Sequence, residues 1–160
     1  MKRVIFACVG AITVIIGIAL YYFFYLQSID TKFAIKYSQV FGSYDINQVD
    51  QYLNKETIIS YKGLSGTYGQ LRNNVISAFK EHKFKMADGS SYGSGNDKFI
   101  NGVQEVNIQS YVIYKDGSTE VPITMQLEKN GINKFTVKSL SNDDDFFGYL
   151  FFGIKNKSNK

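Results

Sequence analysis

The hydrophobic positions along this 160-residue chain first form one unbroken run, over residues 4–26. The run contains no charged residue, and Thr13 is its single aliphatic hydroxyl. A helix rises about 1.5 Å per residue, so this run would be about 35 Å long, which exceeds the roughly 30 Å of a bilayer's hydrocarbon core. We therefore predict a transmembrane helix over 4–26.

Residues on both sides of the run predict its orientation. Lys2 and Arg3 precede it, and positive charge favours the cytoplasmic side, so residues 1–3 are expected in the cytoplasm. The C-terminal domain, residues 27–154, is then expected outside a single-pass cell membrane. A cleaved secretory signal is the alternative, although the run exceeds the usual apolar region of about 7 to 15 residues.

A helical period follows the apolar run. Phe33, Tyr37, Val40 and Phe41 fall on one face of a helix that should stop at Gly42. Asp45 resembles the N-cap of a short second helix. A β-branched segment over 56–61 then predicts a strand, and 63–66 predicts a glycine turn. Thr67 and Gln70 have the spacing of a capping box before a longer helix that ends near His82.

From Val103 onward the hydrophobic period changes to two, as in strands with one buried face. Turn signals at 116–117 and 130–131 divide this part into a meander of three strands. Pro122 lacks an N–H, so we expect it at an edge or a bulge. The segment 84–99 is compatible with an additional irregular strand.

This order, helices first and then a strand meander, resembles the nuclear transport factor 2-like superfamily over residues 31–140. The resemblance implies an α+β cone in which helices pack on a curved, mainly antiparallel sheet. Enzymes of that superfamily often place an Asp with a His inside the cone. His82 is the only histidine here and has no identifiable acidic partner in the sequence, so we assign no catalytic residue.

Composition limits the other function classes. The formal charge of +4 falls to +2 (16 basic against 14 acidic side chains) once Lys2 and Arg3 are set aside, which is too weak for a nucleic-acid partner. Cys8 is the only cysteine and lies in the apolar run, so the outer domain has no disulfide. The glycines at 63–69 do not have the spacing of a nucleotide-binding loop, and we predict no cofactor.

The C-terminal segment SNDDDFFGYLFFG combines three aspartates with a run of aromatic residues. The aspartates at 143–145 lack the later oxygen ligands of a calcium loop, so we predict no metal site and interpret them as the start of a short helix or last strand. The aromatics should cover the sheet. Alternatively, Phe147 and Phe151 contact a partner or the bilayer, as Lys155 and Lys157 of the basic tail 155–160 could.

Two functions remain open at this level. The first is a non-catalytic extracytoplasmic domain, held to the bilayer by 4–26, that binds or stabilises an envelope protein. The second is a small-ligand or enzymatic pocket inside the cone. Tyr37, Tyr61, Tyr68 and Phe79 are the candidate lining residues of that pocket, because aromatic side chains are common in ligand sites.

Overall fold

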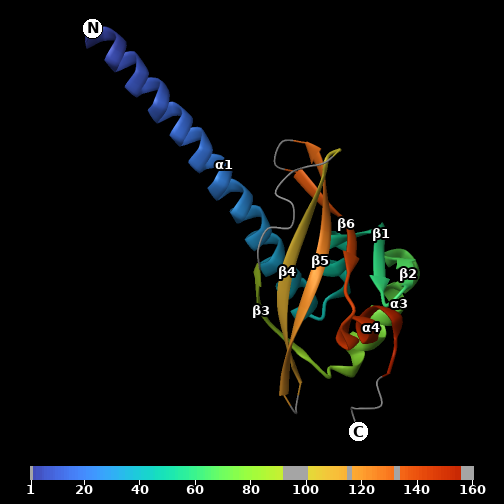
Figure 1. The fold of residues 1–160 in the computed structure, drawn as a ribbon. Helices are drawn as coiled ribbons and strands as arrows, with labels where there is room; N and C mark the ends of the chain where they lie inside the picture. Colours follow the sequence, from blue (N-terminus) through green and yellow to red (C-terminus); the bar gives the residue numbers. More distant parts are fainter. Residues whose placement is uncertain (1, 92–100, 115–116, 132–133, 156–160) are drawn as a thin grey trace.

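The computed structural model describes residues 2–91, 101–114, 117–131 and 134–155. In these residues four helices pack with one six-stranded mixed sheet, which confirms an α+β fold (Figure 1). The elements in chain order are α1 (Lys2–Gly42), α2 (Ile46–Tyr52), β1 (Leu53–Tyr61), β2 (Leu64–Thr67), α3 (Tyr68–Glu81), β3 (Lys85–Ser91), β4 (Val103–Tyr114), β5 (Gly117–Gly131), β6 (Lys134–Ser141) and α4 (Asp145–Phe152).

The strands of the sheet lie in the order β2-β1-β6-β5-β4-β3. All neighbours are antiparallel except β1 and β6, whose parallel register pairs Ile59 with Leu140. The β4–β5 hairpin pairs continuously from Val103 opposite Glu128 to Tyr114 opposite Gly117. The prediction of a mainly antiparallel sheet is therefore confirmed.

Helix α1 has two parts with different surroundings. Its C-terminal part contacts β3 and β4 and buries Ala34, Tyr37 and Phe41, which follow the helical period predicted from the sequence. Its N-terminal part projects away from the rest of the molecule (Figure 1). We call this projecting part, residues 2–31, the stem, and residues 32–155 the head. Among the described residues, no helix meets the length and apolarity required to cross a membrane.

The core of the head lies between one face of the sheet and helices α1, α3 and α4. Alternate residues of β4 and β5, such as Val106, Ile108 and Ile123, face this core and are almost completely buried. Helix α4 packs against α3 and also contacts β1. The aromatic C-terminal segment is thus part of the core that the sheet and the helices share.

Local signals identified several element ends correctly. Asp45 caps α2 by accepting a hydrogen bond from the Asn47 N–H at 2.9 Å. Before α3, the Thr67 N–H donates to Gln70 Oε1 at 3.0 Å, as a capping box requires. His82 ends α3 in the left-handed conformation with φ 48°.

The predicted glycine turn at 63–66 is wrong in extent. The turn is formed by Lys62 and Gly63, both with positive φ, and the following residues form strand β2 at the edge of the sheet. Gly63 has φ 81°, a conformation that glycine adopts without steric cost. The two turn residues are enough to reverse the chain, so the remaining residues are free to pair with β1.

Candidate functional site

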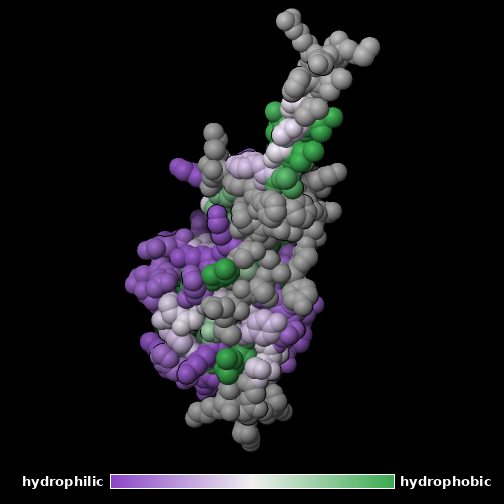
Figure 2. Space-filling model, turned by 90° about the vertical axis from the view of Figure 1, so that its left-hand side faces the viewer, coloured by the Kyte–Doolittle hydropathy of each residue, from purple (hydrophilic) through white to green (hydrophobic). Residues whose placement is uncertain are grey.

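The first candidate is the stem, which presents large apolar side chains to its surroundings. The large apolar residues of the described stem that are at least 50 % exposed are Ile12, Val14, Ile15, Ile16, Ile18, Leu20 and Tyr21. Consecutive helical residues point about 100° apart, so Val14, Ile15 and Ile16 alone cover most of the circumference. Figure 2 shows these apolar residues as a separate green zone above a largely polar head.

The second candidate is the interior between α1 and the sheet, where some polar groups are buried without partners. The Tyr37 hydroxyl is completely buried and forms no hydrogen bond in the described structure. Burial raises its pKa far above the ordinary value, so it stays protonated. The side-chain amide of Gln104, 1 % exposed, also has no partner for its nitrogen or its oxygen.

Other interior polar groups next to Tyr37 are paired. The Tyr52 hydroxyl donates to the Phe33 carbonyl oxygen at 3.3 Å, and the rings of Tyr37 and Tyr52 lie 6.4 Å apart. The neighbouring Ser38 hydroxyl pairs with that of Ser110 at 3.2 Å. A polar group that is buried without a partner lowers stability, so the Tyr37 hydroxyl and the Gln104 amide are each a group that a bound molecule could satisfy.

The four predicted lining residues do not surround one space. Phe79 is joined to Tyr37 through Phe41, with ring centroids 6.5 Å and 4.6 Å from that of Phe41. Tyr61 instead packs on Phe152, the last residue of α4, with ring centroids 5.9 Å apart. Tyr68 donates its hydroxyl hydrogen to Asp50 at 2.7 Å. All four side chains are at most 5 % exposed and are packed as parts of the core.

The aspartates of the C-terminal segment tie α4 to β1. Asp144 is the N-cap of α4 and accepts from the Phe146 N–H at 2.7 Å, which confirms that the aspartates start a helix. Asp145 accepts from the Tyr61 hydroxyl at 3.0 Å and from Lys62 Nζ at 2.8 Å. Asp143 accepts from the Lys62 N–H at 3.0 Å. Each carboxylate thus has a structural contact.

Phe147 and Phe151, the two aromatic residues of α4 with a partner or a bilayer as their alternative contact, are buried in this structure. Phe147 and Phe151 are 0 % exposed, and the Phe151 ring packs edge-on against Phe41 at 5.6 Å. Neither ring has exposed surface through which it could contact another molecule in this structure. Lys155 is exposed and pairs with Glu81 at 3.7 Å, at the end of the head opposite the stem. Lys157 lies outside the described residues.

A surface pocket of about 560 Å³, which the sequence did not suggest, lies between α2, β1 and α3. Arg72 donates two hydrogen bonds to Asp50, at 2.8 Å and 2.7 Å, and the Tyr68 hydroxyl donates a third at 2.7 Å. The Arg72 hydrogen bond, followed by that from Tyr68, lowers the pKa of Asp50. Because these charges satisfy one another, the geometry is that of a structural clamp between α2 and α3.

A second groove, of about 950 Å³, lies on the outer face of the sheet where β6 turns away toward α4. Its floor includes Pro122 and Thr124 of β5, and its wall is formed by Ser141 to Asp144. Pairing between β5 and β6 starts at Thr124, so β6 does not pair with β5 at Pro122. Pro122 therefore lies in a locally one-sided part of β5, as its missing N–H required.

Acid, base and metal chemistry find little support in the described residues. His82 is exposed and its ring packs against that of Tyr44 at 4.4 Å, at the end of α3. In the parts of the chain that the structure describes, no group of three His, Cys, Asp or Glu side chains is arranged to hold a metal ion.

Comparison with known proteins identifies the fold. No protein-family model matches the sequence, and no curated protein is similar to it. A domain of unknown function with a cystatin-like fold from Nostoc punctiforme superposes with a TM-score of 0.58 at 10% identity, over 82% of this chain and 88% of that one. An NTF-2 like protein of unknown function from Shewanella oneidensis superposes with a TM-score of 0.52 at 10% identity, over 74% of this chain and 97% of that one. The head therefore has the nuclear transport factor 2-like, or cystatin-like, fold, as the sequence resemblance implied.

Proposed function

We propose that this chain is a membrane-held binding domain: residues 4–26 lie in a bilayer, and the head binds or stabilises another envelope protein. The observation that carries the proposal is the exposure of apolar side chains around the circumference of the stem over residues 12–21. A helix that docks in a protein groove needs one apolar stripe, whereas a helix in lipid is apolar on every side. The stem has the second pattern.

The expected orientation follows from the charges before the stem. Lys2 and Arg3 favour the cytoplasmic side, which would place the head outside the cell membrane. A binding role is supported by the packed interior, in which the Phe41 ring packs against those of Phe79 and Phe151. A shared fold does not assign a function, so the proposal rests on these features of the chain itself.

The stem is tested by flotation of the full chain with phosphatidylcholine vesicles. Ile16→Lys places a charge near the middle of the apolar run, at a cost of about 2.5 to 3.5 kcal/mol, so we expect it to reduce the floated fraction strongly. Ile35→Lys is the matched control, because Ile35 is an exposed residue of the same helix within the head. Equal flotation of the two variants, or none by the unmodified chain, would contradict the proposal.

The head is tested by photo-crosslinking in intact cells. Ile58 of β1 and Leu64 of β2 are exposed apolar residues near one edge of the sheet, and Ile113 of β4 is exposed near the opposite edge. A photoreactive residue at each position should give one discrete product, from positions near one edge of the sheet. No product at any position, together with turnover of a small substrate by the purified chain, would refute a non-catalytic binding role.

A second candidate function is a small-ligand site inside the head. It is favoured by the two unpaired interior groups, the Tyr37 hydroxyl and the Gln104 amide. A ligand with a hydroxyl or carbonyl could satisfy them. If the interior binds such a molecule, mass spectrometry of gently purified protein should detect a bound compound that disappears in the Gln104→Leu variant.

A further inference from the structure

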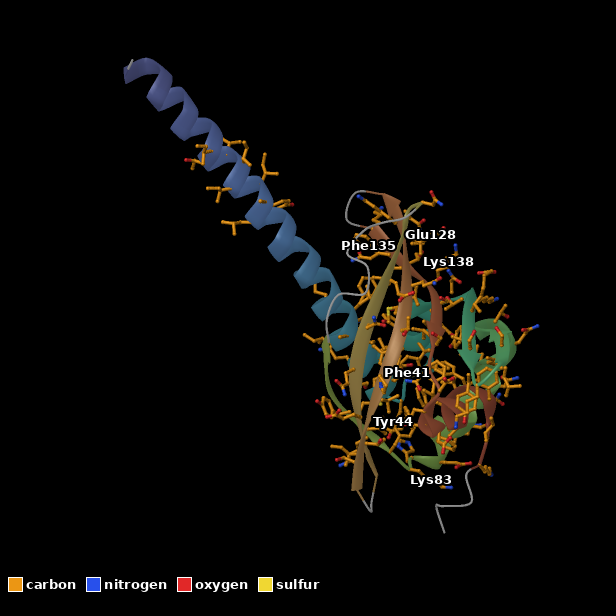
Figure 3. The ribbon with its side chains drawn as sticks, viewed as in Figure 1. Phe41, Tyr44, Lys83, Glu128, Phe135 and Lys138 are labelled. Atoms are coloured by element: carbon orange, nitrogen blue, oxygen red, sulfur yellow. The ribbon has the colours of Figure 1, made fainter. Side chains whose placement is uncertain are left out.

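The end of the head nearest the stem carries a group of lysines from three elements. The start of β4, the end of β5 and the start of β6 lie at this end, whereas α4 lies at the other (Figure 1). Figure 3 shows Lys138 and Phe135 at the first end and Lys83 at the second. The exposed lysines of the first end, which we call the stem-side lysines, are Lys32, Lys36, Lys129, Lys134 and Lys138.

These cations outnumber the acidic groups around them. Glu105 of β4 and Glu128 of β5 lie at the same end, Glu56 lies on the neighbouring strand β1, and Asp30 precedes Lys32 by two residues in α1. Apart from Lys129, the stem-side lysines take no part in the ion pairs found among the described residues, which involve Lys62, Arg72, Lys83 and Lys155. Lys32, Lys36, Lys134 and Lys138 thus have no carboxylate partner in the described structure.

The distance from these lysines to the apolar run is short and is set by a helix. Phe33 of α1 packs edge-on against Phe135 of β6, with ring centroids 6.4 Å apart, and Phe135 directly follows Lys134. Leu26, the last residue of the apolar run, precedes Phe33 by seven residues in the same helix, which corresponds to about 10 Å. This distance is about one Debye length at moderate salt. The charge of Lys134 therefore interacts with the surface of a bilayer that surrounds residues 4–26.

We propose that the stem-side lysines bind the phosphate groups of anionic phospholipids and hold this end of the head on the membrane surface. The inference rests on the proposed function, because the stem brings the head to the bilayer. Lysine ammonium groups suit this task, since they interact with phosphate as mobile point charges and need no fixed geometry. The opposite end of the head, with Lys155 and its Glu81 partner, then points away from the membrane.

The test uses the full chain with Cys8→Ser and Asn130→Cys, which puts a fluorescent label among the stem-side lysines. The protein is reconstituted in vesicles of phosphatidylcholine alone or with added phosphatidylglycerol, each containing a lipid with a nitroxide quencher on its head group. We expect stronger quenching in the anionic vesicles, and its loss in 1 M salt, where the Debye length is about 3 Å.

Two triple variants separate lipid binding from general charge effects. Replacing Lys129, Lys134 and Lys138 by Gln should reduce the ratio of docked to free heads about 5-fold per lysine in anionic vesicles. The control replaces Lys80, Lys83 and Lys155 by Gln, an equal loss of charge at the far end, and should leave quenching unchanged. Melting curves of both variants confirm folding.

The outcomes distinguish the two proposals. If the chain does not float with neutral vesicles, the proposed membrane anchor fails. If it floats normally but quenching is the same in neutral and anionic vesicles, or the two triple variants behave alike, the anchor stands and the lysine inference is overturned.

Discussion

At the scale of single residues, Gly148 lies closer to another side chain, that of Tyr61, than any other described glycine of the head does. A Cβ atom on Gly148 would lie 2.6 Å from the Tyr61 ring, which is buried and held by its hydrogen bond to Asp145. Gly148→Ala should therefore lower the free energy of unfolding by about 1 to 3 kcal/mol, as overpacked cores do. Gly66→Ala is the control for denaturant unfolding, because its nearest neighbour would be 3.4 Å away. Equal stability of the two variants would show that the Tyr61 ring moves freely.

Tyr37 allows a test of whether the interior holds a bound molecule. Its hydroxyl is buried without a partner, so Tyr37→Phe removes an unpaired polar group and should raise the free energy of unfolding by about 1 kcal/mol. Tyr52→Phe is the matched change at a neighbouring ring, and it should lower stability because it removes the hydrogen bond to Phe33. Destabilisation by Tyr37→Phe in thermal melts would mean that the hydroxyl has a bound partner in solution.

Asp50 gives the stability of the head a dependence on pH. Hydrogen bonds from Arg72 and Tyr68 lower its pKa below the ordinary 3.8, so the unfolded chain takes up the proton more readily than the folded one. The stabilisation is present above pH 3.8 and is lost as the pH falls through the folded pKa. At neutral pH, Asp50→Asn should lower the free energy of unfolding by at most about 1 kcal/mol, because the Asp50–Arg72 pair is one-third exposed. In strong acid the substitution should leave the free energy of unfolding unchanged. Denaturant unfolding at both pH values checks this, and Arg72→Gln should add little in the Asp50→Asn background.

At the scale of elements, α4 is the part of the chain on which the head depends most. Phe146, Phe147, Leu150 and Phe151 are at most 2 % exposed, and burial of each contributes about 1.5 to 3 kcal/mol. The sum is comparable to the whole stability of a small domain. A chain that ends at Asn142 should therefore lose its cooperative thermal transition, whereas one that ends at Lys155 should keep it. Identical melting of the two chains would show that α4 is dispensable.

The caps of α4 should be tolerant of chemical change, by contrast. Asp144→Asn should alter the melting temperature little, because asparagine caps a helix about as well as aspartate, whereas Asp144→Ala should cost about 1 kcal/mol. Calcium should not raise the melting temperature of any of these variants. A rise with calcium would show that Asp143 to Asp145 bind the ion, against the structural role assigned here.

At the scale of the whole molecule, the sequence predicted what depends on local patterns. Three signals depend only on residues close in sequence: the N-cap Asp45, the capping box of Thr67 and Gln70, and the alternation in β4 and β5. The sequence therefore predicted the elements to which they belong. The clamp of Asp50 with Arg72 joins residues far apart in the chain, and nothing in either residue's neighbourhood indicates the other. The burial of Phe147 and Phe151 was likewise undecided, because an all-apolar helix suits a core and a docking surface equally.

The head and the stem share one helix, and this has a mechanical consequence. A flexible tether would let the head swivel, but α1 runs without interruption from Lys2 to Gly42 and ends among core residues such as Tyr37 and Phe41. A tilt or rotation of the stem must therefore tilt or rotate the sheet by the same angle, because one continuous helix connects them. Whatever holds residues 4–26 also decides which side of the sheet faces a binding partner.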